Sequence, residues 1–305
     1  MLRAELARGD RVMEASSGIL HHLLSHDGQS SFSDEILARV NGMIGHLADQ
    51  LLLALAMHLQ GTDPDEFALA RREPLISLLI DNHACLLHLH GLALEWQLAQ
   101  RMQQRTADDP DLSPLLQALI SSEDETMASS AMALLASQAR FTLQARRMEL
   151  PLAELPGDLF HMALLSLRNC TQSPEEEAAA VAAEKQWRAE FDESRGRLAL
   201  ASRLVTAMGG GAMAALSISH AGAPLFLSAL AMASGQSRLS ATLATTEQQK
   251  VRLALSLRAA GLKPDMVKHQ LALIQPEVVM PEGVLHLGVE HAMTLLAETS
   301  QIGMR

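Results

Sequence analysis

The amino-acid sequence predicts an all-α protein of stacked antiparallel helical pairs, as in an α-solenoid or a multi-helix bundle, with a second helical subdomain. Aromatic residues make up only 3% of the 305 residues, and Tyr is absent from the sequence. Leu, Ala and Met, which favour helices, fill the apolar positions, whereas the β-branched and aromatic residues typical of strands are scarce. With 48% apolar and 19% charged residues, the composition is typical of a globular chain.

The longest apolar stretch, residues 75–102, is the second observation that predicts this fold. At 3.6 residues per turn it divides into three stripes, two of them apolar, whereas a surface helix has only one. The third stripe is narrow and carries small and polar residues: Ser77, Asp81, Ala84, His88, Gly91 and Glu95. We therefore expect one continuous helix after Pro74, packed between neighbouring helices and exposed to water only along the third stripe.

The segments before this stretch also carry residues that begin and end helices. Residues 2–24 are expected to form a first helix, which ends in a loop rich in Gly, Ser and Asp. Ser33 is expected to cap a second helix that runs to about His58, with two acidic residues at its positive end. Pro64 suits the first turn of a short third helix.

A sequence pattern recurs at a spacing of 46 positions. The segment DPDEFALARREPL begins at Asp63 and DPDLSPLLQALIS begins at Asp109, and the Arg-Met pairs at 101–102 and 147–148 share the same displacement. A short helix followed by a long helix at this period is what stacked helical pairs produce. Over residues 30–170 this construction resembles the HEAT-like and armadillo-like α-helical repeats, and the resemblance concerns architecture alone.

A change in the type of helix predicts a boundary near residue 171. Ser173 and Pro174 are a strong helix start, followed by three acidic residues that suit the positive end of a helix. The apolar line of this helix is thin and its other faces are charged, unlike the helices before it. We therefore expect a helical-pair stack at residues 1–170 and a C-terminal helical subdomain at residues 171–305.

The second half contains further helix starts and stops, and one long uncharged segment. We expect a capping box of Thr245 and Gln248, a helix end at Gly261, a helix start at Pro264 and a last helix from Pro281 to about Ser300. Residues 204–237 contain no Asp, Glu, Lys or Arg. Because glycines and a proline divide this segment into pieces too short to span a bilayer, we expect a tightly packed, buried helical hairpin there.

The apolar stretch also holds candidate ligand or metal-binding residues: Asp81, His83, His88, His90 and Glu95. His83 and His90 are seven residues apart and share a helical face, and the line of acid, histidine and acid on the third stripe suits metal binding or acid–base chemistry. Residues seven apart cannot join one metal ion without ligands from other helices, because the usual helical pair is three or four apart. The alternative is that the two histidines lie in the core and the third stripe is simply the exposed edge.

Two weaker candidates lie elsewhere in the chain. His22 and His26 are four residues apart, which suits two metal ligands on one helix, although a helix C-terminus also favours histidine through its dipole. The segment from Ala231 to Leu243 has glycine and serine at the turn of a helix-turn-helix pattern, but polar residues occupy positions that should be apolar. Its second helix would carry a single charge, that of Arg238, so DNA-linked regulation is only a third interpretation.

The net charge, the two cysteines and the absence of known motifs restrict the classes of function that the sequence supports. The formal net charge of −11, without a basic patch, argues against nucleic-acid partners, and no cofactor-binding glycine motif is present. Cys85 and Cys170 are far apart in sequence and suit free thiols in a reducing, cytoplasmic setting, and no secretory signal or membrane segment is expected. The sequence therefore predicts a non-enzymatic helical scaffold that binds a protein or peptide, and it is also compatible with a homo-oligomer. The alternative is a ligand- or metal-binding protein, or an enzyme, using the 75–102 histidines and acids.

Overall fold

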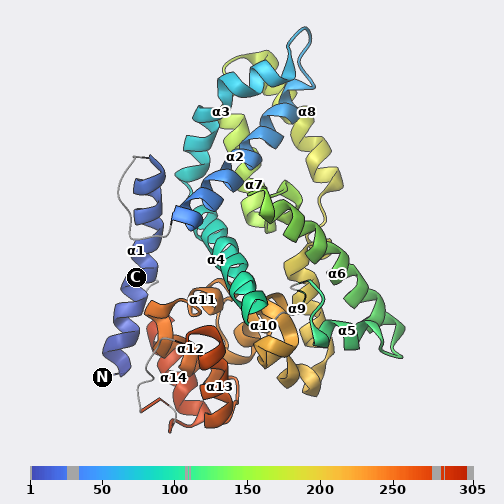
Figure 1. The fold of residues 1–305 in the computed structure, drawn as a ribbon. Coiled ribbons are helices and arrows are strands. Elements are labelled where there is room, and N and C mark those ends of the chain that lie inside the picture. Colours follow the sequence, from blue (N-terminus) through green and yellow to red (C-terminus); the bar gives the residue numbers. More distant parts are fainter. Residues whose placement is uncertain are drawn as a thin grey trace. The chain divides into compact units, whose positions relative to one another are not determined.

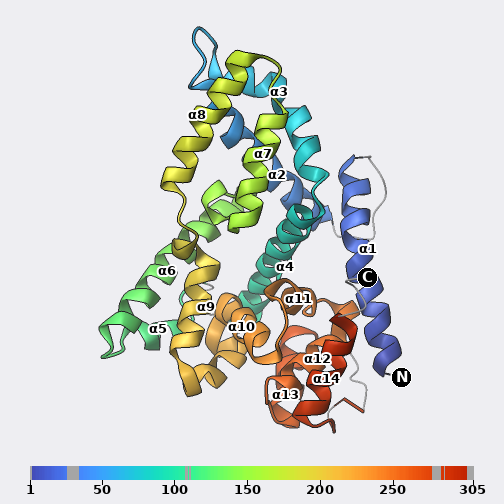
Figure 2. The ribbon, with the colours of Figure 1, turned by 180° about the vertical axis from the view of Figure 1, so that it is seen from behind.

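The fold is all-α, as predicted, and the described part of the chain contains helices and no strand. The structure, a computed structural model, describes residues 2–25, 34–106, 109, 111–276, 283–284 and 286–300. The predicted helix cap at Ser33, the candidate ligand His26 and the helix start at Pro281 lie outside these residues. Figure 1 shows the order of the helices along the chain, and Figure 2 shows them from behind.

The chain forms two compact units, each assembled from separate segments. Unit 1 comprises Met1–Ser16, Gly91–Ala139 and Leu200–Arg305, and unit 2 comprises Ser17–His90 and Arg140–Ala199. Residues of both units are found in α1 (Leu2–Ser25), α4 (His83–Thr106), α6 (Glu125–Arg146) and α9 (Arg197–Ala207). The division predicted near residue 171 falls inside unit 2 and does not coincide with this one.

Unit 2 is centred on four helices that pack against one another. They are α2 (Asp34–Ala56), α3 (Pro64–Ile80), α7 (Gly157–Asn169) and α8 (Pro174–Glu190), accompanied by the 3-10 helices η1 (Leu152–Glu154) and η2 (Glu193–Arg195). Apolar residues of α2 recur every three or four positions and are fully buried: Val40, Ile44, Leu47, Leu51 and Leu55. Pro64 lies in the first turn of α3, as predicted, and the side chain of Asp63 accepts the capping hydrogen bonds there, while the predicted cap Ser173 accepts one from the backbone N–H of Glu176.

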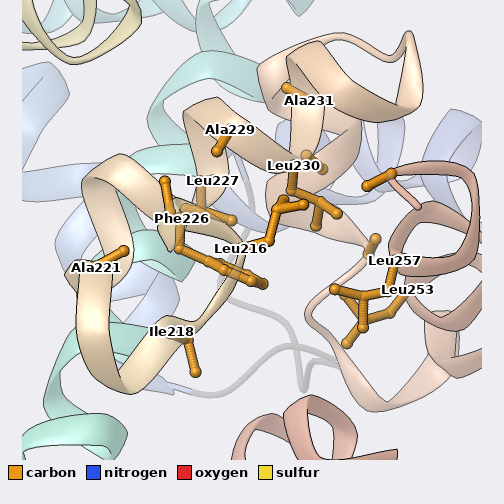
Figure 3. Packing of buried hydrophobic residues seen from close by; sticks show 14 of the residues in the cluster. Leu216, Ile218, Ala221, Phe226, Leu227, Ala229, Leu230, Ala231, Leu253 and Leu257 are labelled. Atoms are coloured by element: carbon orange, nitrogen blue, oxygen red, sulfur yellow. The ribbon is translucent and has the colours of Figure 1, made fainter. Parts of the chain in front are cut away.

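The helices of unit 1 surround a large apolar core. They are α5 (Pro114–Ile120), η3 (Gly209–Leu216), α10 (Ile218–Ser234), α11 (Arg238–Leu243), η4 (Glu247–Gln249), α12 (Lys250–Ala259), α13 (Pro264–Ile274) and α14 (Val289–Ser300). Helix α10 packs against η3, α5, α11 and α12, and α12 packs against α13 and α14. Figure 3 shows Phe226, Leu227 and Leu230 of α10 in the same apolar cluster as Leu253 and Leu257 of α12, all of them fully buried.

The expectation of one continuous helix over residues 75–102 is wrong. Helix α3 continues through Pro74 and ends at Ile80, and α4 begins at His83. The side-chain oxygen of Asn82 accepts a hydrogen bond from the backbone N–H of Cys85 at 2.9 Å, which caps the first turn of α4. A proline removes only one backbone hydrogen bond from a helix, and α3 tolerates that loss at Pro74. The side chain of Asn82 instead competes for a backbone N–H, and the helix breaks there.

Most residues of the two apolar stripes in this stretch are buried, as expected, but His83 is exposed, and the third stripe is not exposed throughout. Leu79 and Leu86 of one stripe and Leu75 and Leu89 of the other are fully buried. On the third stripe Asp81 is exposed, whereas Glu95 is only 2% exposed. The exposed edge therefore ends before the last member of the stripe.

Two further local expectations are corrected by the structure. Thr245 donates its hydroxyl to the carbonyl of Thr242 at 2.7 Å, and the cap of η4 is Thr246, which makes no side-chain capping bond, so the capping box does not form. Helix α10 is buried as expected for the uncharged segment, but the glycines at 209–211 are exposed, and a Cβ built on any of them meets nothing within 4 Å. Tight packing therefore does not explain this glycine run.

Within the described residues no single helix has both the length and the apolar composition to cross a bilayer, while the bent pairs α3–α4 and α9–η3 meet those two criteria together.

Close packing in unit 2 predicts opposite effects for two helical glycines. A Cβ on Gly42 of α2 would lie 2.6 Å from the Cβ of Met148 and 2.9 Å from its carbonyl oxygen, whereas a Cβ on Gly18 of α1 meets nothing within 4 Å. We expect Gly42→Ala to destabilise the protein by about 1–3 kcal/mol, because backbone must move. Gly18→Ala should stabilise it by about 0.5–1 kcal/mol through helix propensity. Urea denaturation of both variants tests this, and equal effects would contradict the packing around Gly42.

Candidate functional site

The histidine and acid residues predicted as ligands do not gather into one site. Asp81, His83, His88 and His90 belong to unit 2, and Glu95 belongs to unit 1. Among the described residues, no group of three or more His, Cys, Asp and Glu side chains is placed to hold a metal ion. Each candidate is therefore described in its own surroundings.

At the junction of α3 and α4, two of the candidates lie beside a histidine that sequence reasoning missed. The Nε2 atom of His21 on α1 lies 2.9 Å from Oδ1 of Asp81, and the ring centroids of His21 and His83 are 6.3 Å apart. His83 is exposed, in contrast to its expected place in the core, because it is the first residue of α4. His22, the residue singled out from the sequence, is exposed on the same helix as His21. A helical pattern alone could not distinguish His21 from His22, because their roles depend on the neighbouring helix.

The remaining histidines of α4 are more enclosed. His88 is half-buried and His90 is 3% exposed, which agrees with the core alternative for His90. Burial lowers the pKa of His90 from 6.5 to about 4, because the charged imidazolium would lose its hydration. His90 is therefore neutral at pH 7.

Glu95 is paired with Arg238, the residue that the helix-turn-helix interpretation assigned to a recognition helix. The guanidinium of Arg238 donates to both carboxylate oxygens of Glu95, at 2.9 and 3.1 Å, and also to the hydroxyl of Ser228 and the carbonyl of Pro224 at 3.3 Å. This is a bidentate ion pair inside unit 1. Helix α11 is only 6 residues long, and its one basic side chain is engaged in this pair, so the structure offers no support for DNA binding through it.

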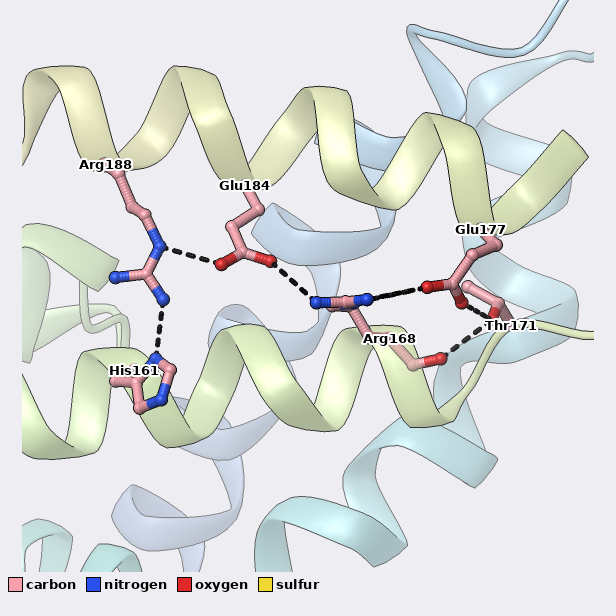
Figure 4. A network of polar contacts seen from close by, with 6 residues as sticks. All are labelled: His161, Arg168, Thr171, Glu177, Glu184 and Arg188. Carbon is pink, nitrogen blue, oxygen red and sulfur yellow. Dashed lines mark hydrogen bonds and ion pairs between the residues drawn. The ribbon is translucent and has the colours of Figure 1, made fainter. Parts of the chain in front are cut away.

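In unit 2, a ladder of polar side chains joins α8 to α7 through hydrogen bonds and ion pairs. Figure 4 shows its members in order: His161, Arg188, Glu184, Arg168, Glu177 and Thr171. Arg168 donates to Glu177 at 2.9 Å, and this bond with that from Thr171 lowers the pKa of Glu177. These residues are largely solvent-accessible, so the ladder positions the two helices rather than binding a desolvated ligand.

An open groove of about 310 Å³ lies in unit 1 between the end of α10 and α14. Its lining consists of Ser234, Gly235, Gln236, Met293, Thr294, Leu296 and Ala297. None of these side chains titrates, so these walls of the groove offer no general acid or general base. Two large apolar side chains are half-exposed on its helices: Met293 of α14 is 44% exposed and Met232, in the last turn of α10, is 48% exposed.

One wall of this groove is held in place by a buried polar cluster. The amide of Gln236 donates to the hydroxyls of Ser234 at 3.2 Å and Ser256 at 2.5 Å, and its oxygen accepts from Arg252 at 3.4 Å. Arg252 is 2% exposed and is ion-paired with Asp10. The side chains that bond to Gln236 are themselves buried, so these hydrogen bonds hold the turn between α10 and α11 in one conformation. The sequence did not predict this groove, since it depends on two helices distant in sequence.

A second cavity, of about 160 Å³, lies in unit 1 beside the start of α12 and is more polar. Glu5, Arg8, Lys250 and Arg252 contribute charged side chains to it. Asp10 already compensates the charge of Arg252, and the cavity contains no histidine, cysteine or second carboxylate. Of the groups that can act as acid, base or nucleophile, its lining holds one carboxylate, Glu5, and one amine, Lys250.

Comparisons with known proteins found no match: no family model, no curated protein and no solved structure is significantly similar to this chain.

Proposed function

We propose that this chain is a non-enzymatic helical scaffold that binds a protein or peptide partner in the groove between α10 and α14. The observation that carries the proposal is an open groove with apolar and amide walls, lined by the half-exposed Met293 and by no titratable side chain. Methionine side chains are unbranched and polarisable, so they adapt to apolar partners of different shapes. A groove of this composition favours binding over catalysis.

Methionines dominate the exposed apolar surface of unit 1, which further supports this proposal. Its exposed large apolar residues are Val12, Met132, Met213, Met232, Met266, Val289 and Met293. Of these, Met293 lines the groove between α10 and α14. Both described cysteines are free thiols, which suits the reducing cytoplasm that we propose as the site of binding.

The ligand- or metal-binding alternative has less support. Its candidate residues are divided between exposed positions, a buried neutral histidine and an ion pair, and the described residues offer no metal-binding group. A scaffold that binds through α10 and α14 requires none of those residues.

Selection of peptides from a random displayed library tests the proposed function. We expect peptides selected on the wild-type chain to lose about fivefold to tenfold in affinity when Met293 is replaced by Ser, because a methionine buried by the peptide contributes about 1–1.5 kcal/mol. Met266→Ser is the matched control, since Met266 on α13 is 47% exposed and does not line the groove. Selected peptides that all bind the Met293→Ser variant as tightly as the wild type would refute the proposal.

A further inference from the structure

The polar cavity of about 160 Å³ beside the start of α12 is lined by charged side chains, most of which are unpaired. Helix α1 contributes Glu5 and Arg8 to its lining, and α12 contributes Lys250 and Arg252. Arg252 is ion-paired with Asp10. The other three charged side chains make no ion pair with any residue that the structure describes. Charges of both signs therefore line this cavity without compensating each other.

Two buried polar atoms of opposite charge on this lining have no hydrogen-bond partner among the described residues. One is the Oε2 atom of Glu5, and the other is the Nε atom of Arg252, a residue that is only 2% exposed. A buried carboxylate oxygen needs a donor and a buried guanidinium N–H needs an acceptor, because each has lost its bonds to water. A ligand in the cavity that donates to Glu5 and accepts from Arg252 satisfies both atoms.

The first turn of α12 carries positive charge where helices usually carry negative charge. The helix begins at Lys250, and its first turn contains Lys250 and Arg252 but no acidic residue. Gln249, which precedes the helix, makes no side-chain capping bond to it. A helix N-terminus is equivalent to roughly half a positive charge and binds anions through its backbone N–H groups. The start of α12 therefore favours a negatively charged group in the cavity.

Contacts between α1 and the segment that begins α12 hold the cavity in place. The side-chain amide of Gln249 donates to the carbonyl of Gly9 at 2.7 Å, and Arg252 pairs with Asp10 on the same helix. A Cβ added to Gly9 would overlap the side-chain amide of Gln249, so the two segments approach closely there. The charged groups of the cavity are therefore carried by elements that are bonded to each other.

The remaining lining and the volume restrict the size of a ligand. Leu6 and Val251, both buried, give the cavity an apolar wall. Sites for drug-sized ligands have volumes of roughly 300–1,000 Å³, so this cavity suits a smaller molecule. A simple anion would be repelled by Glu5, and a simple cation would be repelled by Lys250 and Arg252. A small ligand with both charges and a short apolar group matches the whole lining.

We infer that this cavity binds a free α-amino acid with a short aliphatic side chain. Its ammonium group donates to Glu5, and its carboxylate lies against Lys250, Arg252 and the first turn of α12. Its side chain contacts Leu6 and Val251. This site is separate from the groove between α10 and α14, and its occupation does not depend on the proposed function.

Three small molecules with one carbon skeleton test the need for both charges. L-Valine carries both, isovalerate is valine without the ammonium group, and isobutylamine is valine without the carboxylate. We expect L-valine to bind the wild-type chain with a Kd of about 0.1–1 mM in an NMR titration. Each analogue should bind at least about tenfold more weakly, because it loses charge-assisted hydrogen bonds on one side of the cavity.

Two substitutions test the assigned residues separately. Glu5→Gln should weaken L-valine about tenfold and leave isovalerate bound at least as tightly as in the wild type, since isovalerate has no ammonium group. Lys250→Gln should weaken L-valine and isovalerate about fivefold to tenfold. The matched controls are Glu123→Gln and Lys268→Gln, which change exposed residues of unit 1 outside the cavity and should bind L-valine as the wild type does.

Several outcomes would overturn the inference. If L-alanine, L-valine and L-leucine all fail to bind at about 10 mM, the cavity holds only water. If isovalerate binds the wild type as tightly as L-valine, the site recognises an anion and Glu5 has no part in it. Equal losses in Glu5→Gln and Glu123→Gln would show that net charge, and not the cavity, governs binding. The unchanged or tighter binding of isovalerate to Glu5→Gln excludes misfolding as the cause of its loss of L-valine.

Discussion

Replacing Arg238 with Met is expected to destabilise unit 1 by about 3–5 kcal/mol, because it leaves the Glu95 carboxylate buried without its cation. Glu95 is 2% exposed and accepts two hydrogen bonds from Arg238, and that guanidinium also reaches Ser228 and the carbonyl of Pro224. A buried ion loses hydration that only its partner replaces. Removing one member therefore costs far more than the pair contributes by its presence.

The two tryptophans allow this loss to be measured in the correct unit. Trp96 lies in unit 1 and Trp187 in unit 2, so a Trp187→Phe background gives fluorescence from unit 1 alone during guanidinium denaturation. Arg203→Met, which removes an exposed arginine of unit 1, is the control and should change the free energy of unfolding by less than about 0.5 kcal/mol.

Replacing both members of the pair provides the complementary test. Glu95→Leu with Arg238→Met removes both buried charges, so we expect the double variant to regain most of the stability that Arg238→Met alone loses. A double variant as unstable as the single one would show that packing around Arg238, rather than the uncompensated charge of Glu95, causes the loss.

His90 is expected to remove about 3 kcal/mol of stability between pH 7 and pH 4. Its pKa falls from 6.5 to about 4 on folding, so between these values the unfolded chain takes up a proton that the folded chain does not. The free energy of unfolding therefore decreases as the pH falls below 6.5, and the decrease from this group ends near pH 4, where the folded histidine is also protonated. Above pH 6.5 the group causes no pH dependence, since it is neutral in both states.

Comparison of two glutamine variants isolates this contribution from the carboxylates. We expect the stability difference between the wild type and His90→Gln to shift by about 3 kcal/mol in favour of the variant from pH 7 to pH 4. His58→Gln, at an exposed position of unit 2, should follow the wild-type pH profile. Parallel pH profiles for the wild type and His90→Gln would show that His90 is protonated in the folded chain as readily as in the unfolded one.

Several helix ends could be located from the sequence because their causes are local. Asp63 and Ser173 cap helices by bonding to backbone N–H groups within three residues. Gly261 has a φ of 91°, which glycine adopts without strain, and Pro264 begins the next helix with its fixed φ. Sequence patterns predicted a helix start after Pro74 and missed the break at Asn82, because proline disfavours helices more strongly than asparagine does. Helix α3 nevertheless continues through Pro74.

The candidate site could not be found in this way. The apolar periodicity of residues 75–102 indicated burial but placed Glu95 on the exposed edge, since it reports the face of a residue and not what covers that face. Arg238, 143 positions away, covers it. The groove likewise depends on the neighbouring positions of Met293 and the α10–α11 turn, which no local pattern encodes.

The sequence by itself determined that the chain is helical, that most of the apolar residues in 75–102 are buried, and where several helices begin and end. Propensity, capping and periodicity act over a few residues, so they can be derived from the order of residues alone. Only the tertiary structure decided that Glu95 pairs with Arg238, that His21 lies against Asp81, and that α10 and α14 enclose a groove. Each of these depends on contacts between residues distant in sequence, and such contacts are set by how whole helices pack.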